Sequence, residues 1–394
     1  MSTTPDTLVI GGGLHGLSSA LYLARAGRRV AIVERKWVGR HASGATAAGV
    51  RTLNRDPAEI PISLEAMDMW HHIESIVGDD CGFHAYGQIS IAEHREHVAG
   101  LERRLAAMRS AGYTHEELID RHELLRLVPS LSPHCTAALI ARNDGAADPH
   151  KTLAAFRRAA EGTGVSIHEG VAVRAIERHD AHWLVRTSAQ DLSVPTIVNA
   201  AGAWAGQIAA MLGDTIPLGV KASMMIVTER IAPLLKPVIS VVGRPLSFKQ
   251  ANQGTLVIGG GLQGHADIEA QRSSVDFREL AKGARAARDL FPSIGPVRIV
   301  RTWAGIEAKT EDLLPVVGPS PNANGVFHAF GFSGHGFQLV PVVGAIIADL
   351  VVRGGTNRNI TGLAPGRLVA SGPTTASPHS CSRRLPSTAD HHAR

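Results

Sequence analysis

Aromatic side chains and cysteine are scarce in this sequence of 394 residues, with 4% aromatics and three cysteines. Cys81, Cys135 and Cys381 lie far apart and form no CxxC pair, so their spacing predicts neither a metal site nor a disulfide framework. Reduced thiols are typical of intracellular proteins, and we expect a cytoplasmic location. With so few aromatics, the core must depend on alanine, valine, leucine and isoleucine.

Long hydrophobic runs and dense clusters of one charge are also missing. We expect no signal peptide at the start, because residues 8–10 lead straight into glycines, which predicts a strand and a turn. The longest apolar stretch, residues 337–352, contains Pro341 and Asp349 and is short for a bilayer, so we expect no transmembrane segment. The net charge of +5 comes without a Lys/Arg cluster, which gives no reason to expect nucleic-acid binding.

A βαβ pattern stands at the start of the chain. An apolar run at residues 8–10 precedes three glycines, a helical pattern over 14–26 and a second apolar run at 30–33. Similar elements recur in the middle and at the end, with strand-rich segments between them, which indicates a cofactor domain interrupted twice by a substrate domain. The periodicity predicts further helices over 57–77, 94–111, 152–162, 273–291 and 339–352, and strands over 86–92, 165–168, 171–177, 183–187, 196–199, 221–228, 256–258, 297–303 and 326–330.

The glycines form a dinucleotide-binding pattern, Gly11-x-Gly13-x-x-Gly16, between the first strand and the first helix. Gly11 permits a tight turn, Gly13 lets a pyrophosphate approach the backbone, and Gly16 lets the helix pack on the strand. The helix begins at Leu14 and would offer free N–H groups to the phosphates. Glu34, which ends the second strand, is placed to accept hydrogen bonds from a ribose.

Three further segments are rich in small residues. Residues 43–49 follow the second strand and would let backbone lie against a flat ring system, although a flexible linker is the alternative. Residues 198–204 end an apolar strand in a turn. Residues 331–338 precede the last helix, whose N-terminus would stabilise the negative charge that reduced flavin carries at its pyrimidine end. The alternative for this last segment is a purely structural, glycine-rich helix start.

On these residues the chain resembles the FAD-dependent D-amino-acid oxidase superfamily, in its glycine oxidase and sarcosine oxidase branch. The resemblance covers about residues 5–360 and is carried by GGGLHGLSSALYLARAG, VNAAGAW, RTWAGIEAKTEDLLPVVG and, most specifically, GFSGHGF. Within this branch the chain is similar in particular to the beta-type subunits of sarcosine oxidase, D-hydroxyproline dehydrogenase and opine oxidase. The resemblance implies bound FAD and hydride transfer from the substrate α-carbon to flavin N5.

The implied fold is α/β, or α+β overall. A discontinuous Rossmann-type FAD-binding domain would comprise residues 1–80, 145–215 and 295–362. The inserted substrate domain, residues 81–144 and 216–294, would be built on a mixed, largely antiparallel sheet. From about residue 365 the chain is rich in Ser, Pro, Thr, His and Arg, which predicts a disordered tail over 365–394.

Four residues are candidates for the reaction itself: Arg51, Lys249, His335 and Gln338. Arg51 falls where sarcosine oxidases place an arginine near the substrate carboxylate, and a guanidinium offers that group two parallel donors. His335 would either move a proton or shape the loop against the flavin. The resemblance assigns cofactor binding to Gly11, Gly13, Leu14, Gly16, Glu34, Arg35, Ser43, Ala47, Ala48, Gly49, Val173, Ala201, Gly202, Trp204, Gly305, Gly331, Phe332, Gly334, His335 and Gly336, and no metal is expected.

Several positions depart from the family's pattern. Gln338 stands where sarcosine oxidase has a lysine that helps hold the carboxylate, which indicates a substrate of different shape or size. Glu307 replaces an arginine of glycine oxidases and argues against their binding mode. Gly305 and Thr46 occupy the positions of the cysteine and histidine that tether flavin in related enzymes, so we expect non-covalent FAD.

The positions that govern reaction with oxygen differ as well. Monomeric sarcosine oxidase places a lysine over the flavin to activate O2, and the alignment puts Leu256 or Val257 there; Lys249, one strand and turn earlier, is an alternative cation. This favours a dehydrogenase that oxidises a small amino or imino acid and passes electrons to a partner subunit or acceptor. An H2O2-producing oxidase and a non-catalytic flavin-binding subunit stay open, as does the choice among sarcosine, proline or hydroxyproline, D-amino acids and opines.

Overall fold

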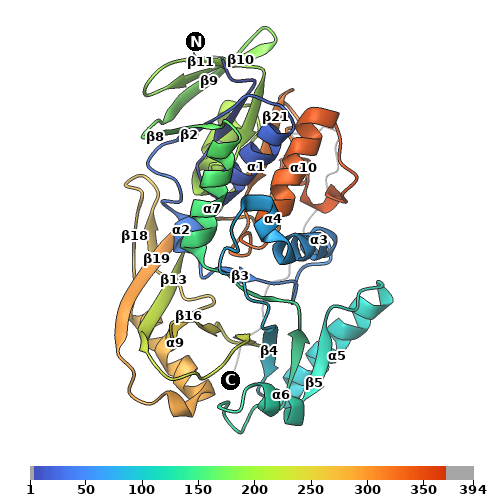
Figure 1. Cartoon of the computed structure of the whole chain (residues 1–394), viewed down its shortest axis with the longest axis vertical. Coiled ribbons are helices and arrows are strands. Elements are labelled where there is room, and N and C mark those ends of the chain that lie inside the picture. Colours follow the sequence, from blue (N-terminus) through green and yellow to red (C-terminus); the bar gives the residue numbers. More distant parts are fainter. Residues whose placement is uncertain (1–3, 370–394) are drawn as a thin grey trace, which may run out of the picture.

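Two sheets of different type lie at opposite ends of the molecule in the computed structural model, which describes residues 4–369 (Figure 1). The first has six strands in the order β20-β21-β12-β1-β2-β8, and only its edge pair β20–β21 is antiparallel. Its strands are β1 (Thr7–Ile10), β2 (Val30–Glu34), β8 (Ser166–Glu169), β12 (Thr196–Asn199), β20 (Val316–Pro319) and β21 (Val326–Phe330).

The βαβ unit predicted from the sequence is the centre of this sheet. Every residue of β1 is buried, and parallel neighbours flank the strand on both sides. Helix α1 (Leu14–Arg25) follows and packs against α7 (Pro149–Gly162) and α10 (Val340–Arg353). The helices α1 and α10 approach closely because Gly344 has no side chain: a Cβ there would lie 2.2 Å from Oγ of Ser18. That hydroxyl donates a 2.7 Å hydrogen bond to the carbonyl of Val340.

The second sheet has eight strands in the order β19-β13-β16-β15-β14-β4-β6-β5 and is antiparallel except for the parallel pair β14–β4. The mixed, largely antiparallel sheet implied by the resemblance is therefore confirmed. Its strands are β4 (Gln88–Ala92), β5 (Glu117–Asp120), β6 (Ala137–Ala141), β13 (Gly219–Arg230), β14 (Val238–Val241), β15 (Ser247–Gln250), β16 (Thr255–Gly259) and β19 (Ile299–Lys309).

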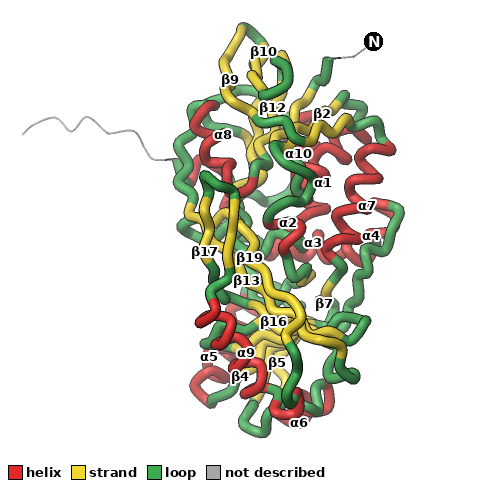
Figure 2. Tube along the Cα trace, turned by 90° about the vertical axis from the view of Figure 1, so that its left-hand side faces the viewer, coloured by secondary structure: helices red, strands yellow, loops and turns green. Residues whose placement is uncertain are grey.

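The two faces of the eight-stranded sheet differ in character. One face carries an apolar core to which α6 (Arg121–Leu127) and α9 (Phe277–Leu290) contribute. The other face looks toward the first sheet, and part of it is covered by α5 (Arg95–Ser110). The long strands β13 and β19 run side by side from the level of α9 toward α8 (Ala205–Met211) (Figure 2).

Short elements complete the fold. They are the strands β3 (Gly49–Val50), β7 (Gly145–Ala146), β9 (Val173–His179), β10 (His182–Thr187), β11 (Leu192–Val194), β17 (His265–Asp267) and β18 (Arg272–Ser274), and the helices α2 (Ala42–Ala45), α3 (Ile60–His71), α4 (Ile73–Val77), η1 (Gly202–Trp204), η2 (Pro292–Ile294), η3 (Thr361–Leu363) and η4 (Pro365–Arg367).

Three local predictions were wrong. The helix expected over 273–291 begins at Phe277, because the Asp276 side chain caps its first turn and residues 272–274 form β18. The helix expected over 57–77 is two helices, α3 and α4, which meet at His72. The disorder expected from residue 365 does not hold for its first residues, since Pro365–Arg367 form η4 and Arg367 pairs with Asp312 at 2.7 Å. The rest of that tail, like Cys381, lies outside the described residues.

The domain boundaries remain our proposal, with one change that the topology requires. The sequence assigns residues 295–362 to the cofactor-binding domain, but β19 pairs along its whole length with β13 of the eight-stranded sheet. Apolar periodicity identifies a strand but does not show which sheet it joins. Within residues 4–369, no helix has the length and apolar character needed to cross a membrane.

Candidate functional site

A cavity of about 1070 Å³ lies between the two sheets and gathers segments from most of the chain. Five of these segments are the turn at residues 10–15, the loop at 39–49, and residues 171–173, 200–204 and 329–337. The remaining wall comes mainly from the inner face of the eight-stranded sheet, with residues 51–55 and parts of α5 and α8. The motifs that the sequence singled out therefore converge on one space.

The glycine turn after β1 brings backbone close to backbone. Gly11 has φ +112°, and a Cβ there would lie 2.4 Å from the carbonyl oxygen of Ala200. Gly16 does not line the cavity; a Cβ on it would lie 2.0 Å from the Gly11 carbonyl, so its role is to seat α1 on the turn. Gly13 lines the cavity at the N-terminus of α1, where a phosphate would meet unshielded backbone.

Glu34 stands beside this turn and lines the cavity. Its Oε2 accepts a 2.8 Å hydrogen bond from the Gly12 N–H, and its Oε1 accepts one of 2.9 Å from the Lys36 N–H. Each carboxylate oxygen keeps a second lone pair, which suits a pair of ribose hydroxyls. Nearby, the Arg35 guanidinium lies 4.8 Å from the ring of Trp204. The turn, the acid and the helix N-terminus fit the adenosine diphosphate half of a dinucleotide.

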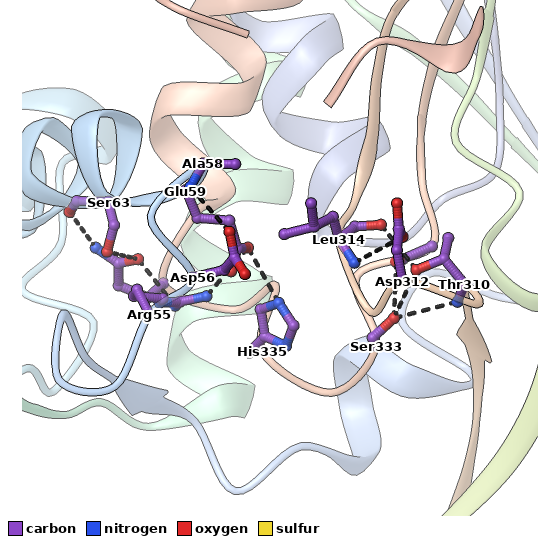
Figure 3. Close-up of polar contacts among 12 residues, drawn as sticks. Arg55, Asp56, Ala58, Glu59, Ser63, Thr310, Asp312, Leu314, Ser333 and His335 are labelled. Carbon is purple, nitrogen blue, oxygen red and sulfur yellow. Dashed lines mark hydrogen bonds and ion pairs between the residues drawn. The ribbon is translucent and has the colours of Figure 1, made fainter. Parts of the chain in front are cut away.

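The glycine-rich loop before α10 forms another part of the cavity wall. Ser333 has φ +53° and is held by Thr310, whose hydroxyl lies 3.1 Å from its own (Figure 3). Nζ of Lys221 donates to the Ser333 carbonyl at 2.9 Å and lies 3.3 Å from Oε1 of Glu307. Gly334, with φ +94°, leaves room for that ammonium group. Glu307 thus neutralises Lys221 beside the loop.

His335 contacts a pair of buried charges (Figure 3). Its Nε2 lies 3.0 Å from Oε1 of Glu59, and Glu59 lies 3.5 Å from Nη1 of Arg55. Burial lowers the pKa of His335, and burial likewise lowers the pKa of Arg55 to about 9, with repulsion from Arg51 adding to the effect. Burial alone would raise the pKa of Glu59, but His335 and Arg55 outweigh it and the net direction is down. At neutral pH we expect neutral His335 beside charged Glu59 and Arg55.

Arg51 lines the same part of the cavity. Its Nη1 donates to the Leu53 carbonyl, which fixes the guanidinium from behind. Burial lowers the pKa of Arg51, and the nearby Asp144 carboxylate opposes that shift. Asp144 accepts hydrogen bonds from the N–H groups of Thr52 and Leu53, and burial raises its pKa to about 6. The segment after β3 therefore presents a pre-positioned arginine to the cavity.

The match to known proteins decides the family. The family model described as FAD dependent oxidoreductase matches residues 6–350. The chain belongs to this family. The glycine turn, Glu34 and the two further glycine-rich segments all line this cavity and fit the family's cofactor, FAD.

Individual members of the family are similar over almost their whole length. The beta subunit of sarcosine oxidase from Rhizobium meliloti (strain 1021) is 26% identical over 89% of this chain and 85% of its own. Glycine oxidase from Geobacillus kaustophilus (strain HTA426) is 28% identical over 88% and 93%. The crystal structure of L-proline dehydrogenase from P. horikoshii superposes with a TM-score of 0.87 at 26% identity, covering 93% of this chain and 98% of that one.

In this FAD-dependent oxidoreductase the cavity collects most of the residues predicted to bind the cofactor. Gly16 and Ala48 are the exceptions; both pack behind the wall, and Ala48 is fully buried. Of the residues predicted to take part in the reaction, Arg51 and His335 line the cavity, whereas Lys249 and Gln338 do not. Their roles in binding and reaction stay predictions.

Gln338 supports the site from inside the protein. Its side chain is 0% exposed, its Oε1 accepts a 3.0 Å hydrogen bond from Nη2 of Arg55, and its Nε2 donates to the Ser63 carbonyl at 2.6 Å. Sarcosine oxidase has a lysine at the position of Gln338. In this protein the second positive charge next to Arg51 comes from Arg55, which lines the cavity. The sequence carries one signal for it, an arginine four residues after Arg51, but Arg55 was not among the predicted site residues.

His15 was also missed. It lies inside the glycine motif, lines the cavity and stacks on Phe332, with ring centroids 3.5 Å apart. Burial lowers its pKa to about 3, so the imidazole is neutral. The contact joins the first glycine motif directly to the last one, and only the folded chain brings them together.

Removing one member of the Arg55–Glu59 pair should destabilise the protein. We expect Arg55→Leu to lower the free energy of unfolding by about 3–5 kcal/mol, because Glu59, 2% exposed, is left as an uncompensated buried charge. Urea unfolding with excess FAD measures the change. The double variant Arg55→Leu, Glu59→Leu should recover part of the loss; an equal or larger loss would contradict the pairing.

Lys249 shares one side of β15 with the cavity-lining Ser247, but its Nζ instead lies 3.3 Å from the Ala147 carbonyl. Its register partner is Val257, whereas Leu256 points into the apolar core on the opposite face. Burial lowers the pKa of Lys249 to about 8, which Asp148 opposes. Compared with the unfolded chain, the folded state favours the neutral amine of Lys249. Protonation of this amine therefore lowers the free energy of unfolding, and the loss reaches its full size below pH 8.

We expect Lys249→Met to stabilise the protein. The shift from 10.5 to about 8, discounted for the partial exposure of Lys249, corresponds to about 2 kcal/mol at pH 7. The stability of the unmodified protein should rise between pH 8 and 10.5. Over this range the difference in stability between it and Lys249→Met should fall to zero. Thermal unfolding across this range measures it; a destabilised variant at pH 7 would show that the ammonium group is favourably paired.

Proposed function

We propose that this protein uses FAD to oxidise the C–N bond of a small amino or imino acid. The observation that carries the proposal is the position of Arg51, a partly buried arginine on the wall of the cofactor cavity near His335. A buried guanidinium that faces a cavity suits a carboxylate. Similarity to sarcosine oxidase, glycine oxidase and L-proline dehydrogenase supports the same class of substrate.

The chain's own residues would act by positioning. Arg51 binds the substrate carboxylate, and Arg55 adds positive charge beside it. Bound FAD would supply the acceptor for a hydride that leaves the α-carbon. His335 keeps its Nε2 toward Glu59, which leaves it as a shape-giving neutral group, so the substrate amine must arrive unprotonated. The N-terminus of α10, behind the glycine loop, favours negative charge at this end of the cavity.

The residues of the cavity wall also bear on how FAD is attached and on which acceptor takes its electrons. Gly305 offers no nucleophile, and a Cβ there would lie 2.5 Å from Cβ of Ala45, so we propose non-covalent FAD. Lys249 and Leu256 do not line the cavity, which supports slow reaction with O2. We therefore propose a cytoplasmic dehydrogenase that passes electrons to a partner subunit or another acceptor, as the similarity to a sarcosine oxidase beta subunit suggests.

Anaerobic mixing of the purified holoenzyme with sarcosine, proline, hydroxyproline and D-amino acids tests this function. We expect at least one of them to bleach the flavin absorbance, and acid precipitation to release the FAD into solution. Bound FAD that no amine reduces, even with candidate partner subunits present, would favour a non-catalytic flavin-binding subunit. Fast peroxide release in air would instead identify an oxidase.

A further inference from the structure

A row of polar side chains crosses the inner face of the eight-stranded sheet, away from the contacts described above. Ser90, Ser240 and Ser247 stand in register on the adjacent strands β4, β14 and β15. All three line the cavity, as does Gln88, two residues before Ser90 on β4. We call these four residues the serine wall.

Two members of the serine wall, both on β4, are buried, whereas Ser240 and Ser247 are partly exposed. Gln88 is 6% exposed and Ser90 is 3% exposed. The alternate residues of the same strands, among them Ile89, Ile239 and Phe248, point into the apolar core on the other face. A sheet that is buried on both faces normally carries apolar residues on both of them. Polar side chains on the inner face indicate that this face contacts something polar.

Several polar atoms around this wall have no partner within residues 4–369. Oε1 of Gln88 is buried and makes no hydrogen bond there, and the same holds for Nδ1 of His97 and Nε of Arg244, which also line the cavity. Buried polar groups are nearly always hydrogen-bonded, because leaving one unpaired is costly. A ligand that offers both donors and acceptors would satisfy them.

The charges near the serine wall are already paired. Nη2 of Arg244 lies 2.7 Å from Oε1 of Glu93, and Nη2 of Arg104 lies 2.7 Å from Oε1 of Glu116. Neither arginine therefore offers an uncompensated charge to a second carboxylate. The Ser240 hydroxyl donates to the Ile89 carbonyl at 3.3 Å and keeps its lone pairs as acceptors. With the hydroxyls of Ser90 and Ser247 and the Gln88 carboxamide, it suits a neutral hydrogen-bonding partner.

The serine wall also lies close to the arginine that we assign to the carboxylate. Leu53, two residues after Arg51, packs in one small apolar cluster with Leu139. Leu139 is the register partner of Ser90. A substrate held at Arg51 would therefore lie on the same side of the sheet as this wall, within one cavity.

We propose that the serine wall is a side-chain subsite for an amino acid whose side chain ends in a carboxamide or hydroxyl. This rests on the proposed function for the placement of the carboxylate at Arg51. It distinguishes the substrate from glycine and sarcosine, which have no side chain to fill the subsite, and from purely aliphatic amino acids.

Binding of carboxylates without an amino group tests the subsite independently of oxidation. Succinamate and 4-methylpentanoate have nearly the same shape, but only the first ends in a carboxamide, and succinate adds a second charge. By calorimetry on the holoenzyme we expect succinamate to bind roughly tenfold more tightly than the other two. Equal or tighter binding of 4-methylpentanoate or succinate, or no binding of any of them, would overturn the proposal.

Variants locate the effect. Gln88→Leu and Ser90→Ala should each reduce the preference for succinamate over 4-methylpentanoate by roughly three- to tenfold. Ser110→Ala, at the exposed end of α5, should leave it unchanged. An unaltered preference in both wall variants would contradict the assignment.

Anaerobic flavin reduction by asparagine and leucine, each as both enantiomers, separates the two proposals. Faster reduction by asparagine supports both of them. If no amino acid reduces the flavin while succinamate is still preferred, the proposed function fails and the subsite stands. If leucine reduces it as fast as asparagine, the function stands and the subsite fails.

Discussion

Replacing Arg51 by methionine is expected to raise the dissociation constant of the amino-acid substrate roughly 100- to 1,000-fold, because two charge-assisted hydrogen bonds to its carboxylate are lost. Arg51 lines the cavity and is fixed from behind through Leu53, so methionine removes the fork without opening the fold. Stopped-flow reduction of the flavin at increasing substrate concentration measures the dissociation constant separately from the limiting rate.

Arg51→Lys provides the matched control. Lysine keeps the charge but not the two parallel donors, so this variant should fall between the unmodified protein and Arg51→Met. FAD content should stay the same in all three. If Arg51→Met binds substrate as tightly as the unmodified protein, the carboxylate is held elsewhere, and Arg55 becomes the first residue to examine.

Gly11→Ala is expected to lower the affinity for FAD roughly 100-fold, through backbone strain and loss of close approach. The residue has φ +112°, and the new Cβ would lie 2.4 Å from the Ala200 carbonyl, which belongs to backbone and cannot rotate away. Relief of this contact requires the turn after β1 to separate from the loop after β12, and both line the cavity. Titration of the apoprotein with FAD, followed by flavin fluorescence, measures the loss.

Gly162→Ala is the control for this change. Gly162 ends α7, and no atom lies within 4 Å of the Cβ position, so alanine should leave FAD binding unchanged. Circular dichroism of both variants shows whether the fold is retained. Normal FAD affinity in a folded Gly11→Ala variant would mean that the cofactor does not depend on this turn.

The cofactor half of the site was readable from the sequence because its chemistry is local. The turn from Gly11 to Gly16 and the acid Glu34 lie on consecutive elements, and their spacing alone predicts a bound dinucleotide. The loop from residue 331 carries its own glycine pattern. Such signals need only the backbone conformation of a short segment.

The substrate half was not readable in this way. The serine wall is assembled from Ser90 on β4 and Ser240 and Ser247 on two strands far along the chain. No short pattern predicts that these residues stand in register. Gln338 illustrates the same limit: its sequence position suggested contact with substrate, but the fold turns it toward Arg55 and Ser63 inside the protein.

The central claim is that a substrate held at Arg51 delivers the hydrogen of its α-carbon to the flavin. The most direct measurement is the anaerobic rate of flavin reduction by the best amino acid, compared with the same compound deuterated at the α-carbon. The account predicts that the deuterated compound bleaches the flavin several times more slowly at saturation. Equal rates, with reduction still dependent on substrate, would contradict hydride transfer from the α-carbon as the step that this cavity controls.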